Sequence, residues 1–354
     1  MVYLCARKPT SYDALSMSDM DQLSFGDGLL SSRRKVSKLT KHLDNLDQII
    51  DWQPLVKDIS VIDKTDSKTG GRPRKNPLWM IKATFLQSLF SLSDPQLEDQ
   101  LIDRLSFQRF VGINLDQEIP DFTTFWRFKE ALAAHQLEER IFERINEQLQ
   151  AKGLLVKKGT IVDASIFPSS GRPLSKTKRE ALAEQPSSQI DTDATSTRKG
   201  RTFYFGYKGH IGVDVESNLI RKATFTPANV HDSTQTEKLI SYDESALFGD
   251  KAYMDMDIKV SARQDGWYYG VLDRAKRGEP LSSSQKKRNR KHSRVRAAVE
   301  HPFGWMKTKA NLVSMRAKNA PRNKLRFLFA CMAWNVSRAR FLLERSSSMG
   351  VVAS

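Results

Sequence analysis

The stretch GTIVDASIF at residues 159–167 decides the fold, because the character of the sequence changes there. Its β-branched residues, and the turn-forming PSSG that follows, indicate a buried strand. Helical patterns fill most of the sequence before it, and short strand patterns fill much of the sequence after it. We therefore expect an α/β protein in which an all-α N-terminal module precedes a mixed central sheet flanked by helices.

Upstream of this strand, residues 66–153 are expected to form the helical module. The segment PLWMIKATFLQSLFSL (77–92) has apolar residues at helical spacing, and Asp121 suits the N-cap of a later helix. Residues 1–65 are only weakly patterned, and residues 346–354 read as a tail. The module should thus be a compact group of helices joined by short links.

Downstream, residues 154–345 are expected to form a second domain. Residues 169–200 are polar and almost free of aromatic side chains, so a flexible excursion is expected there. A basic linker should precede the last helical segments. The other expected elements are strands at 203–215 and 218–228 that form a hairpin, a helix over 233–241, a strand at 246–250, a helix at 255–264, a strand at 267–272, and helices at 293–312 and 322–345.

The charge of the chain favours a polyanionic partner. Fifty-seven Lys and Arg residues oppose 41 Asp and Glu residues, which gives a formal net charge of +16. Such a field attracts DNA through phosphate contacts and counterion release. The charge is clustered, as in QKKRNRKHSRVR (285–296), and no basic run has the apolar face of a membrane-surface helix. Nucleic acid is therefore the expected partner.

Composition also excludes several classes of protein. The hydrophobic fraction is 39%, and no apolar run is long enough to span a bilayer. The N-terminus lacks the pattern of a signal peptide, and only two cysteines are present, too few for a disulfide framework or a zinc site. We expect a soluble, cytoplasmic protein.

Two aspartates stand at the ends of apolar strands and are candidate metal ligands. Asp163 lies in IVDAS, and Asp250 closes ALFGD. Two buried carboxylates repel each other unless a divalent cation lies between them. Oxygen ligands suit Mg²⁺ or Mn²⁺, and a pair of such ions supports in-line phosphoryl displacement. The alternative, that each Asp merely caps a strand or turn, remains open on these residues alone.

A third acidic residue lies between two cations in SRVRAAVEHPFGWMKTKANL. Arg296, Glu300 and Lys307 are spaced by four and seven residues, which places them within roughly 60° on one helix face. Such a stripe can be a solvated face with i,i+4 pairing. It can equally place Glu300 at metal ions while Arg296 and Lys307 hold DNA phosphates. Pro302 is expected to kink this helix.

These residues resemble the DDE transposases of bacterial insertion sequences, specifically the insertion sequence five family. RAAVEHPFGWMK (296–307) matches the family spacing of Arg, three residues, Glu, six residues and Lys. Many relatives carry a Tyr three residues before the Arg, where this chain has Ser293. GTIVDASIF resembles the strand of the first Asp and FGDKAY that of the second. With the helical block, the resemblance covers about residues 30–340.

The resemblance implies a ribonuclease H-like catalytic core in which Asp163, Asp250 and Glu300 bind two Mg²⁺ or Mn²⁺ ions. The implied reaction is hydrolysis at the ends of a mobile element, followed by strand transfer into target DNA. Neither a covalent enzyme intermediate nor a small-molecule cofactor is implied. Two alternatives are a metal-dependent DNA nuclease of the same fold and a non-catalytic DNA-binding derivative.

The resemblance also implies partners. Double-stranded DNA would be bound as terminal inverted repeats, by the helical module, and as target DNA. Because two ends must be held together, a homodimer or larger assembly is implied, acting at the nucleoid of a bacterium.

Further basic residues are candidates for DNA contact. Lys286, Lys287 and Arg288 lie in the run before the Glu300 helix, which can also be read as a solvated loop. Arg72 and Arg74 lie in GRPRK, which resembles a minor-groove hook but is more simply a basic linker.

Three other residues have two readings each. His210 and His231 could be extra ligands or proton shuttles, although a structural role is the simpler interpretation. Asp214 could be a strand acid, but its place beside the expected turn predicts exposure to solvent.

Overall fold

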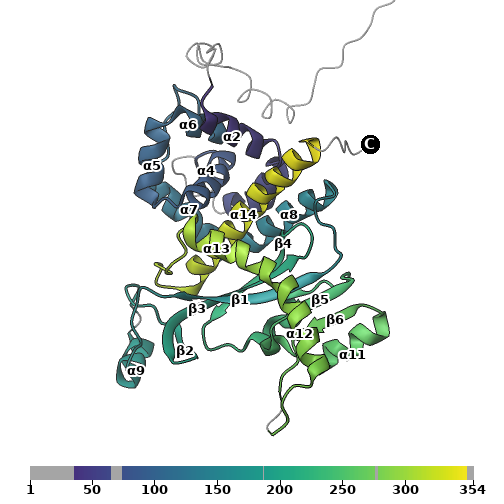
Figure 1. Ribbon diagram of the computed structural model, residues 1–354. Helices are drawn as coiled ribbons and strands as arrows, with labels where there is room; N and C mark the ends of the chain where they lie inside the picture. Colours follow the sequence, from purple (N-terminus) through teal and green to yellow (C-terminus); the bar gives the residue numbers. More distant parts are fainter. Residues whose placement is uncertain (1–35, 65–73, 186, 276–277, 349–354) are drawn as a thin grey trace, which may run out of the picture.

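The computed structural model describes residues 36–64, 74–185, 187–275 and 278–348. A group of helices lies on one side of a central sheet, and the last two helices run between them (Figure 1). The expected mixed α/β class with a central sheet and flanking helices is confirmed.

The helical module forms where the sequence predicts helices. Ser93 caps one helix with a capping box to Gln96, and Asp121 caps another by accepting the backbone N–H of Thr124. Both caps satisfy backbone donors that a helix leaves open at its start. The helices are α2 (Lys38–Asp47), α3 (Gln53–Ile59), α4 (Pro77–Phe90), α5 (Asp94–Asp103), α6 (Leu105–Val111), α7 (Phe122–Ala134) and α8 (Leu137–Ala151).

The described part of the N-terminal segment differs from its expected weak patterning. Helix α2 packs on α6, and α3 packs on α4, α8 and the 3-10 helix η1 (Ser60–Lys64). Trp52 is buried between Phe85 and Phe110, with ring centroids 5.5 and 6.0 Å away. Helices of seven and ten residues give too short a periodic signal to be recognised in the sequence. The helical module therefore extends to the N-terminal side of residue 66.

The sheet has six strands in the order β2-β3-β1-β5-β6, with β4 also paired to β3. Strand β3 runs antiparallel to β1, β2 and β4, whereas β5 runs parallel to β1 and β6. The predicted hairpin is confirmed, and Asn218 in its turn has a φ of 61°. The strands are β1 (Thr160–Pro168), β2 (Thr195–Lys199), β3 (Thr202–Asp214), β4 (Ile220–Pro227), β5 (Ala246–Gly249) and β6 (Tyr268–Val271).

Helices of different lengths connect and cover the strands. The predicted helices at 255–264 and 322–345 are confirmed, and the latter extends through Ser348 into the expected tail. The predicted helix at 233–241 is a 3-10 turn followed by one short helical segment. These elements are η2 (Asp232–Gln235), α10 (Thr236–Leu239), η3 (Lys251–Tyr253), α11 (Met256–Asp265), α12 (Ser283–Arg296), η4 (Ala297–Val299), α13 (Glu300–Thr308) and α14 (Ala320–Ser348).

Helix α14 joins the helical module to the sheet. It packs against α4, α7 and α8 on one side and against β4 on the other. Buried Asn335 donates to Asn146 of α8 and to the carbonyl of Ile220 in β4, both at 2.8 Å. A Cβ at Gly209 would overlap the ring of Phe327, so glycine allows α14 to approach β3 closely. No helix in the described ranges is long and apolar enough to span a membrane.

The expected flexible excursion at 169–200 is instead folded over its described residues. It contains α9 (Lys176–Glu184) and strand β2. Asp191 is 3% exposed and accepts hydrogen bonds from Ser169 and Tyr207, both at 2.6 Å, and from the backbone of Ala194. The segment is anchored by polar contacts to distant residues, which a search for apolar periodicity does not detect.

Candidate active site

The pairing of two parallel strands places Asp163 beside Asp250. In the register of β1 with β5, Ile161 is opposite Phe248 and Val162 is opposite Gly249. Asp163 is the next residue of β1, and Asp250 is the residue that directly follows β5. Since side chains alternate along a strand, both carboxylates project from the face that carries Ile161 and Phe248. Neighbouring strands lie about 4.8 Å apart, so the two acidic groups are close neighbours.

Asp163 is held between a cation and a second carboxylate. Its side chain is 26% exposed. Its Oδ1 accepts a hydrogen bond from the backbone N–H of Ala164 at 2.8 Å, and its Oδ2 accepts one from the guanidinium of Arg296 at 3.2 Å. Burial raises the pKa of Asp163 and Arg296 lowers it, while the negative charge of Asp250 raises it further. The net effect is a raised pKa, so Arg296 only partly compensates for burial and repulsion.

Asp250 is positioned by the turn that follows β5. Its carboxylate accepts the backbone N–H of Lys251 at 2.6 Å, and its carbonyl accepts the N–H of Tyr253 at 2.8 Å. These contacts fix the carboxylate at the carboxyl end of the strand, where it is partly exposed. Tyr253 is buried beneath the turn, and its pKa is raised, first by burial and then by nearby acidic groups that include Asp163 and Asp250.

Glu300 begins a new helix directly after η4, which contacts β1. The long helix expected over 293–312 is divided by η4, so that Arg296 ends α12 and Glu300 begins α13. Pro302 accordingly lies in the first turn of α13, where its missing N–H breaks no helical hydrogen bond. The Glu300 side chain is exposed and forms no hydrogen bond or ion pair with another described residue.

The acidic residues provide oxygen donors of the kind that Mg²⁺ and Mn²⁺ prefer. Asp163 and Asp250 fit such an ion as neighbouring ligands. Within the described ranges, however, no group of three or more His, Cys, Asp and Glu side chains is close enough to hold a metal. The structure therefore brings the two aspartates together with Arg296 and leaves Glu300 on the adjacent helix turn.

Two family models match the chain. One, described as a transposase DDE domain, matches residues 155–336, and another, described as a transposase domain, matches residues 31–131. The chain belongs to the transposase DDE domain family. It is a DNA transposase.

Two solved transposase structures were compared with this transposase. The piggyBac transposase synaptic complex with hairpin DNA aligns with a TM-score of 0.48 and 9% sequence identity. The alignment covers 87% of this chain and 76% of the piggyBac chain. The Mos1 strand transfer complex aligns with a TM-score of 0.19 and 12% sequence identity. The alignment covers 71% of this chain and 82% of the Mos1 chain. Family membership rests on the two family matches.

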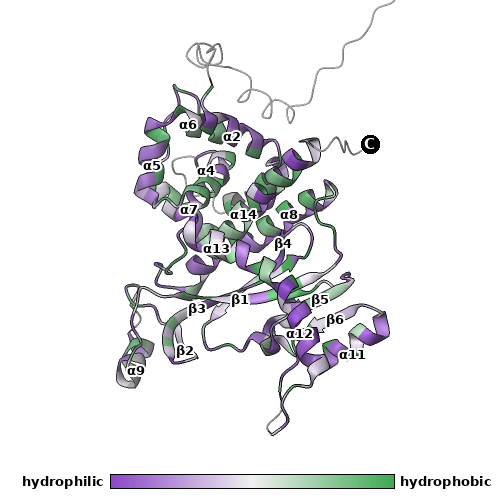
Figure 2. Cartoon of the chain, viewed as in Figure 1, coloured by the Kyte–Doolittle hydropathy of each residue, from purple (hydrophilic) through white to green (hydrophobic). Residues whose placement is uncertain are grey.

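The basic run of the transposase is a helix and not the expected linker or loop. Helix α12 begins with a capping box between Ser282 and Gln285, and it is strongly hydrophilic (Figure 2). Lys286, Lys287 and Arg288 are exposed on it, and Arg288 is paired with Asp273 at 2.7 Å. The spacing of Ser282 and Gln285, which is that of a capping box, could have predicted this helix although no apolar repeat follows it.

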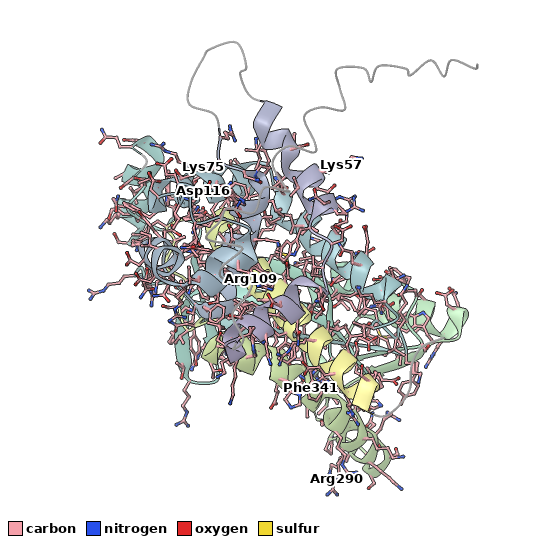
Figure 3. The ribbon with its side chains drawn as sticks, turned by 90° about the horizontal axis from the view of Figure 1, so that it is seen from above. Lys57, Lys75, Arg109, Asp116, Arg290 and Phe341 are labelled. Carbon is pink, nitrogen blue, oxygen red and sulfur yellow. The ribbon has the colours of Figure 1, made fainter. Side chains whose placement is uncertain are left out.

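Helix α12 borders an open groove of about 490 Å³ beside strands β5 and β6. Lys287, Arg288 and Lys291 line it together with the aromatic side chains of Phe248 and Tyr268. Figure 3 shows Arg290, on the same helix, pointing away from the body of the molecule. The helix thus carries seven Lys and Arg residues, the last of which, Arg296, lies beside Asp163.

The remaining sequence candidates are placed as follows. Lys307 is exposed on α13, with its Nζ 5.9 Å from the centre of the Phe167 ring, and burial and Lys199 lower its pKa. Arg74 lines a cavity of about 460 Å³ in the helical module, beside Lys75. Arg72 lies outside the described residues.

The histidines and Asp214 have structural partners. His210 is opposite Ala164, on the sheet face away from Asp163, and it contacts Thr226 at 3.0 Å. His231 caps the 3-10 helix η2. Asp214 is fully buried, contrary to the expected exposure, because its carboxylate accepts backbone N–H groups that close the hairpin turn and the N–H of Lys157.

Sequence reasoning missed Lys199 at the end of β2. Its charge lowers the pKa of both Asp163 and Lys307, so it contributes to the positive field over the acidic pair. It was overlooked because it ends the segment that was read as a flexible excursion.

Proposed function

We propose that this transposase cuts DNA phosphodiesters at the ends of a mobile element and joins those ends to target DNA. The observation that carries the proposal is the strand register, which sets Asp163 and Asp250 side by side with Arg296 over Asp163. The family match supports the reaction class.

The strand arrangement supports a ribonuclease H-like core. Strands β4, β3 and β1 are antiparallel neighbours, while β1, β5 and β6 are parallel neighbours. In this arrangement the first acidic residue lies on the central strand and the second follows the next parallel strand. We also assign the chain to the insertion sequence five family, which is supported by the spacing of Arg296, Glu300 and Lys307.

We assign Asp163, Asp250 and Glu300 as the ligands of two Mg²⁺ or Mn²⁺ ions. Glu300 follows η4, which lies on β1, so a modest movement of its exposed side chain can bring it toward the aspartates. Bound ions would activate the attacking oxygen and stabilise the leaving oxygen of the phosphodiester.

The basic residues of the chain have a positioning role in this proposal. Arg296 offsets the charge of Asp163, and Lys199 and Lys307 place positive charge where a phosphate would approach. Helix α12, with Lys286, Lys287 and Arg288, would bind the backbone farther along the duplex. Arg74 would contact DNA from the helical module, and Arg72, which lies outside the described residues, is also proposed to contact DNA.

The helical module would hold the terminal inverted repeats, and two copies of the chain would hold two ends. Such an assembly would act at the bacterial nucleoid. A doubling of the sedimenting mass of the protein on addition of end DNA, beyond the mass of the DNA, would support the dimer.

The test is cleavage and joining of a duplex that carries the DNA flanking the gene, in the presence of a target plasmid and Mg²⁺. Loss of a group that merely supports a metal ligand costs 10–100-fold, so Asp163→Asn, Asp250→Asn or Glu300→Gln should each reduce cleavage by about 100-fold or more. DNA binding should persist in all three variants.

Asp265→Asn, which alters an exposed carboxylate on α11, is the matched control and should leave cleavage unchanged. Full cleavage by Asp163→Asn would contradict the site assignment. Cleavage by the unaltered protein without any joined product would favour a metal-dependent nuclease of the same fold.

A further inference from the structure

A cavity lies where the helical module meets the C-terminal part of the chain. It has a volume of about 300 Å³ and is lined by the link between α4 and α5, by α7, by residues 310–317 and by the start of α14. We call it the cationic cavity, because Lys129, Arg316, Arg322 and Arg326 all line it. It is separate from the acidic pair on the sheet.

The positive charges of the cationic cavity exceed its negative charges. Lys129 pairs with Asp94, and Arg322 pairs with Glu130 at 3.2 Å. Arg326 donates to the carbonyl oxygens of Ser314 and Asn311, both at 3.1 Å, which satisfy its N–H groups without neutralising its charge.

Arg316 adds a further positive charge to the lining of the cationic cavity. Its exposed side chain has no hydrogen bond or ion pair with another described residue. Two positive charges, on Arg316 and Arg326, thus lack carboxylate partners within the described ranges.

The proximity of these cations is unfavourable in the protein alone. Burial lowers the pKa of Lys129 to about 8, against the attraction of Asp94, and Arg322 and Arg326 lower it further. Burial also lowers the pKa of Arg326, and the charge of Arg316 adds to that effect. Like charges gathered in a partly enclosed site are stabilised when an anion binds among them.

An unpartnered hydroxyl also lines the cationic cavity. The Ser91 Oγ is buried and has no hydrogen-bond partner among the residues that the structure describes, and the backbone of Ser91 has a φ of 58°, which is uncommon for a residue other than glycine. A buried hydroxyl without a partner is costly, and an anionic oxygen in the cavity would accept a hydrogen bond from it.

A purely structural role would account for only part of this arrangement. Arg322 does join the two parts of the chain, since it also donates to the carbonyl of Trp126 at 3.1 Å and lies over the Trp126 ring. Among the described residues, Arg316 makes no such hydrogen bond, and the side-chain hydrogen bonds of Arg326 go to Asn311 and Ser314 in the loop that precedes its own helix. These two side chains remain to bind a ligand.

We propose that the cationic cavity binds a backbone phosphate of the DNA on which the transposase acts. The proposal rests on the proposed function for its DNA substrate. Because Lys129 belongs to the helical module and Arg326 to α14, one phosphate held here would fix the duplex against both parts of the chain.

The test measures DNA affinity against salt concentration for the full chain, with Arg316→Gln, Arg326→Gln and the control Arg263→Gln. Arg263 is exposed on α11, away from the cavity. Each phosphate contact contributes about 0.9 to the slope of log affinity against log salt. Because both side chains would contact one phosphate, we expect Arg316→Gln and Arg326→Gln each to reduce the slope by up to about that amount, and Arg263→Gln to leave it unchanged.

Melting temperatures of the DNA-free variants check their folding, and Arg316→Gln remains informative if Arg326→Gln unfolds, because Arg316 is exposed. Slopes equal to that of the unaltered protein in both folded variants would overturn the proposal. A second arm adds inorganic phosphate to the DNA-free protein at constant ionic strength. Stabilisation by phosphate with unchanged DNA slopes would assign the cavity to free phosphate and would also overturn it.

The outcome is distinguishable from that of the catalytic proposal. Asp163→Asn should retain the full salt slope of the unaltered protein while losing cleavage. Unchanged slopes together with normal cleavage would reject the cavity alone. Reduced slopes in a protein that cuts no DNA would support the cavity and reject the catalytic proposal.

Discussion

At the residue scale, opposing electrostatic effects act on the carboxylate of Asp163. Burial and Asp250 raise its pKa, and the guanidinium of Arg296 lowers it by a smaller amount. An ionised Asp163 is therefore a cost to the folded protein that a cation can relieve. This is the electrostatic state expected of a metal ligand in the absence of its metal.

Asp163→Asn should make the metal-free protein more stable at neutral pH. An acid whose pKa is raised by folding binds its proton more tightly in the folded state, so its ionisation destabilises the fold as the pH rises through that pKa. We expect the melting temperature to rise by about 2 °C at pH 7.5, with no gain at a pH below the unfolded pKa. Mg²⁺ should stabilise the unaltered protein only. A lower melting temperature for the variant at both pH values would contradict this prediction.

His210 should make stability depend on pH. Burial lowers its pKa to about 4, so the unfolded state takes up a proton first as the pH falls. Stability is therefore present above pH 6.5 and is lost between pH 6.5 and 4, by an amount on the order of 3 kcal/mol. Urea unfolding across this range should show a flatter dependence for His210→Gln. His42 and His292, whose pKa values are also lowered, would leave a smaller slope. An identical dependence in both proteins would contradict the role of His210.

At the scale of single elements, the strands were predictable and several other segments were not. The apolar, β-branched run around Asp163 predicts β1 almost to its ends, and the hairpin follows from two such runs and a turn. Helix α12 was missed because it has almost no apolar face, and its stability derives from capping and from the sheet it covers. The segment at 169–200 was missed because its anchor, Asp191, acts through Tyr207 and Ser169.

Asp191→Ala should loosen the segment that joins β1 to β2. The substitution removes the carboxylate that accepts the hydrogen bond of the buried Tyr207 hydroxyl, which should cost up to about 3 kcal/mol in the free energy of unfolding. It should also speed proteolytic cleavage between residues 169 and 200. Glu180→Ala, on the exposed surface of α9, is the control and should change stability by less than about 0.5 kcal/mol. Unaltered proteolysis of Asp191→Ala would show that other contacts hold the segment.

At the scale of the whole molecule, the two parts expected from the sequence share one core. The buried apolar cluster runs from Leu43 in α2 to Ala339 in α14 without a break between the helices and the sheet. Sequence patterns could not predict this, because they report the faces of an element and not its neighbours. The same limit applies to the site. The three acidic residues could be chosen from the sequence, but the pairing of Asp163 with Arg296 and the separate helix of Glu300 required the structure.

The full chain should accordingly unfold in one transition, and residues 36–153 alone should not fold stably. Without α14, the apolar faces of α4, α7 and α8 would be exposed to water. Circular dichroism and tryptophan fluorescence should give coincident urea transitions for the full chain. Cooperative unfolding of the isolated fragment would contradict the shared core.

The measurement that tests the central proposal most directly is the metal dependence of cleavage by Asp250→Cys. Mg²⁺ prefers oxygen ligands, whereas Mn²⁺ lies further toward the metals that accept sulfur. If Asp250 binds the catalytic metal, the variant should fail to cut element-end DNA in Mg²⁺ and should regain activity in Mn²⁺. Asp250→Ala should stay inactive in both. Equal cleavage by the unaltered protein and Asp250→Cys in Mg²⁺ would contradict the assignment of Asp250 as a metal ligand.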